Sequence, residues 1–201
     1  MRLAIFGVLC GLTLSVPALA EGSGPRIRAG EGIGGLLSEF RVGGLWHDLG
    51  AKESSAALNG EILFVSPVPG RLTAGIDPVW RWLLEPRPHL GFTANLEGKT
   101  NKGYAGLTWT AMVARDVWRP GDGVRFGILL GGSVNDGKHD SRLSDRKDLG
   151  GNLLFHVGAE VGYQVDRNLS VSVFIDHDSN GGTANRNQGL NSLGLRLGYA
   201  L

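Results

Sequence analysis

The stretch FHVGAEVGYQV, residues 155–165, alternates at every step between apolar side chains and polar or small ones. Successive side chains of a β-strand point to opposite faces, so this stretch predicts a strand with one apolar and one polar face. The polar face combines charged residues with glycines, which suits the narrow, filled interior of a small barrel better than the surface of a soluble sandwich. The apolar face is therefore expected to point outward.

The same alternation recurs along the chain in segments of roughly ten residues, a pattern typical of the strands of outer-membrane barrels. We therefore predict an all-β fold, an eight-stranded antiparallel transmembrane β-barrel of the outer-membrane type, with a soluble β-sandwich as the alternative. Aromatic residues end the apolar faces, as in the girdles of such barrels: Trp46, Trp109, Tyr163 and Tyr199. The predicted strands are Ser38–Trp46, Ala57–Ser66, His89–Leu96, Gly103–Arg115, Gly123–Val134, Asn152–Val165, Asn168–Ser179 and Asn191–Leu201.

The first twenty residues have the features of a secretory signal peptide. Arg2 supplies the positive start, an apolar run follows, and Pro17 precedes a small-residue ending at Ala20. Cleavage is expected after Ala20, which leaves residues 21–201 as a single outer-membrane barrel domain. Cys10 is the one cysteine of the chain and lies within this leader, so we expect neither a disulfide nor thiolate chemistry in the mature protein.

The composition excludes some classes of function. A formal net charge of +1 gives no field that would attract nucleic acid, and no nucleic-acid partner is expected. The 33 glycines are more than double the usual share of ~7% and are scattered through apolar segments. No apolar stretch beyond residue 20 reaches the ~20 residues that a spanning helix needs, so entry into a membrane requires a closed barrel.

Four connections are expected to face the cell exterior if both ends of the domain lie in the periplasm: residues 47–56, 97–102, 135–150 and 180–190. These connections mix basic with acidic residues. The basic residues either keep the loops soluble or attract the phosphates of lipopolysaccharide, and the sequence leaves both interpretations open. They are Lys52, Lys99, Lys102, Lys138, Arg142, Arg146, Lys147 and Arg186.

Polar residues interrupt the lipid-facing side of the segment 168–179 at its outer end. Valine and isoleucine form this side, and His177 and Ser179 continue it. A polar pair at the edge of the hydrocarbon costs stability, which is tolerated where function needs the pair. Asn191 has outward parity in the following segment, and a hairpin pairs the two segments. We therefore expect the three side chains to meet on one outward patch.

Such a patch permits ester hydrolysis. Ser179 would attack an acyl carbonyl, His177 would accept its proton, and Asn191 would orient the imidazole through its side-chain carbonyl. Asn180 and the backbone N–H groups around Gly181–Gly182 would stabilise the oxyanion. The H-x-S spacing is a weak signal by itself, and the shared outward face is what strengthens it.

The run HDSNGG at 177–182, followed by NRNQGLNSLGLRLGYAL at 185–201, resembles the C-terminal motif of the PagL-type lipid A 3-O-deacylases, which is H-x-S-N, then N-x-G, then a short final strand. Other similar pieces are GGLWHDLG (43–50), PRPHLGFTANLEGKTNKGYAGLTWT (86–110) and LLFHVGAEVGYQ (153–164). The resemblance implies an eight-stranded, multi-pass barrel in the outer membrane of a Gram-negative bacterium. Members of this family remove the ester-linked 3-hydroxyacyl chain at the 3-position of lipid A with a serine–histidine–acid triad and no cofactor.

Carried over by position, the resemblance makes His177 the general base and Ser179 the nucleophile, with Asn180 and Asn187 in support of the oxyanion. The chain departs from the family at Asn191, which stands where the family has an acidic residue. An amide oxygen accepts a hydrogen bond from His177, but it does not stabilise the imidazolium as a carboxylate does. This departure keeps a second class of function open, a non-catalytic eight-stranded barrel with a structural or surface-interaction role.

The expected partner is lipid A of lipopolysaccharide in the outer leaflet, reached within the membrane, and the sequence leaves a homodimer open. We expect no metal and no cofactor. Asp136, His139 and Asp140 lack a second ligand cluster, whereas His89 and His156 have interior parity. Glu160 is expected to form an ion-pair network inside the barrel with Arg41, Arg125 and Arg196.

Overall fold

The computed structural model describes residues 33–49, 51–140 and 143–201 of the chain. The predicted leader, residues 1–20, and the polar segment that follows it up to Gly32 lie outside the described residues. A short 3-10 helix, η1 (Ile33–Leu36), leads into the first strand.

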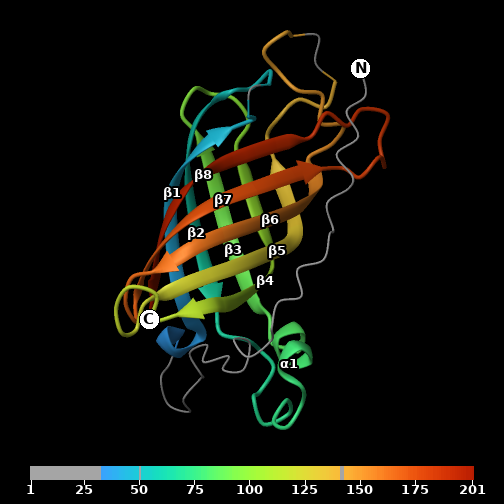
Figure 1. Ribbon diagram of the computed structural model, residues 1–201. Coiled ribbons are helices and arrows are strands. Elements are labelled where there is room, and N and C mark those ends of the chain that lie inside the picture. The colour runs from blue at the N-terminus through green and yellow to red at the C-terminus, as the bar shows by residue number, and fades with distance from the viewer. Residues whose placement is uncertain (1–32, 50, 141–142) are drawn as a thin grey trace, which may run out of the picture.

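Eight antiparallel strands close into one barrel, in which each strand pairs with its neighbours in sequence and β1 pairs with β8 (Figure 1). This topology confirms the predicted fold class. Closure satisfies the backbone hydrogen bonds of every strand and leaves no open sheet edge, which is the condition for a β-structure in lipid. The strands are β1 (Leu37–His47), β2 (Ser55–Phe64), β3 (Arg87–Asn95), β4 (Lys102–Arg115), β5 (Gly123–Asn135), β6 (Leu153–Gln164), β7 (Leu169–Ser179) and β8 (Leu190–Ala200).

The outer wall of the barrel is apolar and its interior is polar. Exposed and buried residues alternate along β7, where Val173 is 51% exposed and its neighbours Ser172 and Phe174 are buried. Trp46 and Tyr199 are exposed near opposite ends of the wall, as the girdle prediction requires. A soluble sandwich would bury its apolar faces in a core, so this closed barrel with an exposed apolar wall excludes that alternative.

Buried ion pairs fill the interior. The guanidinium of Arg41 contacts Glu39, Glu61 and Glu160 at 2.9, 3.1 and 3.1 Å, and Arg125 contacts Glu160 at 3.0 Å. Charges removed from water are tolerated where partners compensate them, and here the acids and bases alternate across the lumen. The predicted network around Glu160 is thus confirmed for two of its three arginines.

Arg196, the third predicted arginine, has other partners. Its guanidinium lies 3.5 Å from Glu61 and stacks 3.2 Å from the centroid of the Phe174 ring. Glycine makes room for such large groups elsewhere in the lumen: a Cβ atom at Gly91 would overlap the ring of Tyr104 on the neighbouring strand. The high glycine content therefore reflects the narrow interior.

The connection between β2 and β3, residues 65–86, contains a helix that the sequence analysis did not predict. This helix, α1 (Pro78–Leu84), begins at the N-cap Asp77, whose side chain accepts a hydrogen bond from the backbone N–H of Val79 at 2.9 Å. Proline at the first helical position supports the same start. No helix in the described part of the chain has the length and apolar character needed to cross a membrane.

The two ends of the barrel differ in their connections. The chain's C-terminus and α1 lie at the same end, whereas β7 ends and β8 begins at the opposite end (Figure 1). The four connections predicted to face outward join strands at that second end. The predicted site residues therefore lie at the end opposite α1 and the C-terminus.

Candidate active site

Strand pairing places the predicted base and its orienting residue side by side. His177 on β7 is the cross-strand partner of Asn191 on β8, and the two side chains are joined by a hydrogen bond of 2.8 Å between Nδ1 and Oδ1. His177 is exposed on the outer wall, as its parity predicted. An amide oxygen is only an acceptor, so this bond assigns the imidazole proton to Nδ1 and leaves the Nε2 lone pair free to act as a base.

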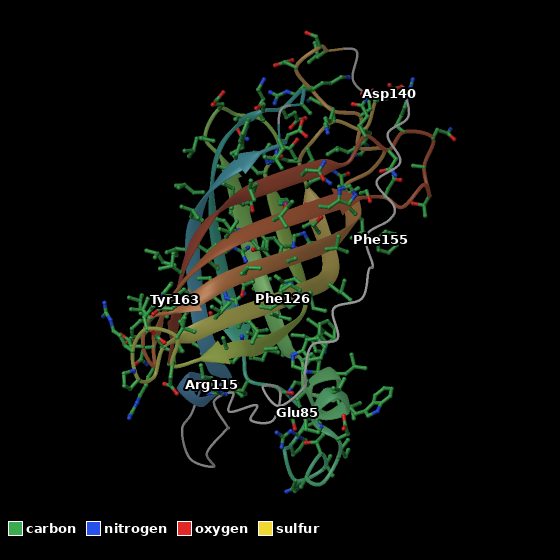
Figure 2. All side chains as sticks on the ribbon, in the orientation of Figure 1. Glu85, Arg115, Phe126, Asp140, Phe155 and Tyr163 are labelled. Carbon is green, nitrogen blue, oxygen red and sulfur yellow. The ribbon has the colours of Figure 1, made fainter. Side chains whose placement is uncertain are left out.

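Ser179 is the last residue of β7 and is half-buried on the same outward side as His177. Its cross-strand partner on β6 is Phe155, which points away from the barrel wall into the surroundings (Figure 2). Among the described residues, His177 is hydrogen-bonded to Asn191 and not to Ser179. Catalytic hydrogen bonds are often long without substrate and tighten in the complex.

Gly189, at the start of β8, packs against both residues. Its φ of +61° lies in the left-handed region, which favours glycine. A Cβ atom built on it would lie 3.0 Å from Cε1 of His177 and 3.6 Å from Cβ of Ser179. Gly189 is therefore a steric wall of the site. The sequence contains it within the quoted N-x-G motif, but only the packing gives it a role.

A buried lysine holds this glycine from another loop. The Nζ atom of Lys147 donates to the carbonyl oxygen of Gly189 at 2.7 Å and lies 2.7 Å from Oδ1 of Asp48. The backbone N–H of Leu49 donates to the carbonyl oxygen of Asn191 at 3.0 Å. Lys147 is thus part of the frame behind the site rather than one of the solvated loop charges.

The same loops enclose a buried carboxylate, Glu53. Backbone N–H groups of Lys147 and Thr100 donate to it at 2.9 and 3.1 Å, and Nε2 of His47 lies at 3.7 Å. Burial raises the pKa of Glu53, but the adjacent imidazole of His47 and the hydrogen bonds from Lys147 and Thr100 outweigh it and bring the pKa to about 2. An ionised Glu53 therefore ties three outer loops together.

Asn180 and Asn187, the predicted oxyanion residues, meet in the loop between β7 and β8. The side-chain amide of Asn180 donates to the carbonyl oxygens of Leu149 and Arg186 at 2.9 and 2.5 Å, and its own oxygen accepts from the N–H of Gly182 at 2.9 Å. The backbone N–H of Asn180 donates to Oδ1 of Asn187 at 3.1 Å. Both residues hold the loop in shape, and their part in oxyanion binding stays a prediction.

One group with the geometry of metal ligands occurs among the described residues, and it lies inside the barrel. The ligand atoms of His156, Asp176 and Asp178 lie within 4.8 Å of one another. The ammonium of Lys102 forms ion pairs with both carboxylates, so a protein cation already compensates them. Asp176 and Asp178 are buried on the lumen side of β7 and do not reach the imidazole of His177 on the outer wall.

Comparison with known proteins gives the following matches. A family model described as lipid A 3-O-deacylase (PagL) matches residues 70–200. The crystal structure of the outer membrane enzyme PagL superposes with a TM-score of 0.54 at 15% identity, covering 81% of this chain and 97% of that chain. The N-terminal β-barrel domain of Pseudomonas aeruginosa OprF superposes with a TM-score of 0.51 at 14% identity, covering 82% and 97%. No curated protein sequence matches significantly.

Proposed function

Since the chain belongs to the lipid A 3-O-deacylase (PagL) family, we propose that it removes the 3-O-linked 3-hydroxyacyl chain from lipid A with Ser179 as the nucleophile and His177 as the general base. The observation that carries this proposal is the 2.8 Å hydrogen bond from His177 to Asn191 on the outward side of the barrel, two residues before Ser179. It orients a base beside a hydroxyl at the surface where an outer-leaflet lipid would lie.

The reaction proceeds in two halves. Oγ of Ser179 attacks the carbonyl carbon of the ester while Nε2 of His177 takes the hydroxyl proton. The tetrahedral intermediate expels the 3-oxygen of the sugar, which receives that proton, and an acyl-enzyme remains. Water, deprotonated by His177, then attacks the acyl carbon. The bond to Oγ of Ser179 breaks, this oxygen takes the proton back from His177, and the 3-hydroxy fatty acid is released. Asn191 keeps the proton on Nδ1 throughout, so that Nε2 is the nitrogen that exchanges protons.

Oxyanion stabilisation is assigned to the loop between β7 and β8. The proposed donors are the side-chain amide of Asn187 and the backbone N–H of Gly181, with Asn180 holding the loop in place through the N–H of Gly182. The positive φ values of Gly181 and Gly182, +65° and +85°, direct the backbone along a path that other residues rarely follow. Preorganised donors of this kind act on charge that develops only in the transition state.

Substrate access follows from the wall around the pair. On β6, Phe155 and Val157 are the cross-strand partners of Ser179 and His177, and both are exposed. They give the acyl chain an apolar surface next to the attacking oxygen. A lipid already in the outer leaflet need only diffuse sideways to reach this surface, so we place the protein in the outer membrane with lipid A as its partner.

The absence of an acid at position 191 predicts a slower enzyme than one with a carboxylate there. An uncharged acceptor makes a weaker hydrogen bond to the imidazolium than a carboxylate does. Asn191 is also the feature that favours the second candidate, a non-catalytic barrel with a structural or surface-interaction role.

Mass spectrometry of lipid A separates the two candidates. The protein is expressed in a strain whose lipid A retains its 3-O-acyl chains, and the lipid is weighed with and without the protein. Loss of one 3-hydroxyacyl chain, abolished by Ser179→Ala and by His177→Ala, supports the esterase. Val173→Ala, on the same face of β7 but away from the pair, is the control and should retain activity. Unchanged lipid A with a correctly folded barrel would support the non-catalytic role instead.

A further inference from the structure

The long connection between β2 and β3, residues 65–86, carries an apolar surface outside the barrel. Outer-membrane barrels ordinarily have short turns at the periplasmic end, and the other two connections here, residues 116–122 and 165–168, follow that rule. None of the residues of α1 is buried. Its large exposed apolar side chains are Val79, Trp80, Leu83 and Leu84.

These side chains share one face of the helix. At ~100° per residue, the four fall within an arc of ~140°, and Arg81 lies outside that arc. Trp80, within the arc, is 61% exposed. A helix with aromatic and leucine side chains on one side and a basic residue on another is typical of helices that lie in the plane of a membrane interface.

Two tryptophans fix the helix to the barrel wall. Nε1 of Trp82 donates to the carbonyl oxygen of Thr110 at 3.0 Å, and Nε1 of Trp109 donates to the carbonyl oxygen of Leu83 at 2.9 Å. The pairing of β3 with β4 ends at Thr108, so α1 lies beside the part of β4 that β3 leaves uncovered. The helix is therefore held against Trp109 of β4, at the end of the barrel where the C-terminus lies (Figure 1).

The helix needs a further surface to be stable. Seven residues are too few for a helix that stands alone in water. The two tryptophan hydrogen bonds join one side chain and one backbone carbonyl of the helix to β4 without covering its apolar face. The apolar face continues the barrel wall, whose surroundings are lipid. Continuity with that wall therefore identifies the missing surface as the bilayer.

We propose that α1 is an interfacial anchor, whose apolar face inserts into the phospholipid leaflet on the periplasmic side of the outer membrane, at the boundary between headgroups and acyl chains. An anchor at this end fixes how deeply the barrel sits. It thereby sets the depth at which the candidate site on β7 and β8 lies within the opposite leaflet. The proposal concerns a membrane contact and does not depend on the esterase activity.

Spin labels test the anchor. In a full-length chain carrying Cys10→Ser, a nitroxide is attached at Trp80→Cys or, separately, at Leu83→Cys, and the protein is reconstituted in liposomes of phosphatidylethanolamine and phosphatidylglycerol. Collision rates with oxygen and with a water-soluble nickel chelate report the surroundings of each label. Val173→Cys on the wall is the lipid reference, and Arg167→Cys in the exposed turn between β6 and β7 is the aqueous reference.

We expect oxygen-to-nickel ratios at positions 80 and 83 that exceed the aqueous reference several-fold and approach the lipid reference. Each variant should resist unfolding in cold detergent, which shows that its barrel has formed. Two label positions are used so that the test still stands if one of the two cysteine variants does not fold. Ratios equal to those at position 167 would overturn the proposal. Low access to both reagents would overturn it as well, because that result indicates a protein contact, such as a second copy of the chain.

Discussion

Gly189→Ala tests whether the backbone immediately before β8 shapes the candidate active site. The substitution places a methyl group 3.0 Å from Cε1 of His177, a distance that van der Waals repulsion does not tolerate without movement. The imidazole has to shift by a few tenths of an ångström or the glycine backbone has to withdraw. Either movement disturbs the 2.8 Å hydrogen bond between His177 and Asn191.

The expected effect of Gly189→Ala has two parts, a loss of folding stability and a loss of rate. A non-glycine residue at a φ of +61° costs about 1 kcal/mol of folding stability. Weakening the hydrogen bond that orients the base raises the barrier by about 1 kcal/mol, and misplacing a catalytic group by up to 1 Å adds a loss of up to about 100-fold. Since about 1.4 kcal/mol corresponds to a factor of ten in rate, the weakened hydrogen bond alone lowers kcat/KM about fivefold, and the added displacement extends the expected loss to at most about 500-fold.

The assay is the initial rate of 3-hydroxy fatty acid release from lipid A in detergent micelles, together with urea unfolding of the same samples. Gly98→Ala is the matched control. Gly98 has a φ of +66°, and nothing lies within 4 Å of a Cβ atom built on it. The Gly98→Ala variant should lose as much folding stability as Gly189→Ala and keep the wild-type rate. A wild-type rate in Gly189→Ala, or an equal loss of rate in both variants, would refute the role assigned to Gly189.

Three further predictions concern residues 53, 147 and 191. Asn191→Asp or Asn191→Glu should keep or raise kcat/KM, because a carboxylate stabilises the imidazolium, whereas Asn191→Ala should lower it about tenfold. Loss of activity in both acidic variants with retention in Asn191→Ala would contradict this role. Lys147→Met should lower the release rate about tenfold, because Gly189 loses its 2.7 Å hydrogen bond. The exposed control Lys138→Met should match wild type, and a normal rate in both variants would show that the frame is dispensable. The pKa of Glu53 is lowered from 4.5 to about 2, so its contribution to stability is complete above pH 4.5 and is lost as the pH falls toward 2. As the pH falls from 4.5 toward 2, the outer loops of the wild-type protein should become more sensitive to protease, and those of Glu53→Gln should change less. Identical pH profiles of the two proteins would exclude Glu53 as the cause of the loss of protection.

The alternation of polarity determined the fold. Side chains in a strand repeat every two residues, so the sequence alone assigns each residue of β7 to the wall or to the lumen. That rule predicted the outward position of His177, and the hairpin connection predicted the pairing of β7 with β8; the structure confirms both. The bond between His177 and Asn191 follows from this pairing, because a hairpin fixes the register of its two strands.

Loop residues obey no such period, and their contacts were decided by the tertiary structure. Lys147 and Asp48 are ion-paired across two loops, and their partnership depends on how the closed barrel brings the strand ends together. The sequence placed Lys147 among the loop charges that either keep the loops soluble or attract phosphates, because charge and loop position are all that a local pattern contains.

The helix α1 was missed for a related reason. A seven-residue amphipathic run is too short for its periodicity to be recognised against the alternation of the strands, and its position comes from the tryptophan contacts with β4. Sequence by itself thus determined what repeats, namely the strands, their faces and the outward position of the proposed catalytic pair on one of them. The tertiary structure decided what does not repeat, because contacts such as Lys147 with Gly189 exist only once closure has set the distances between remote segments.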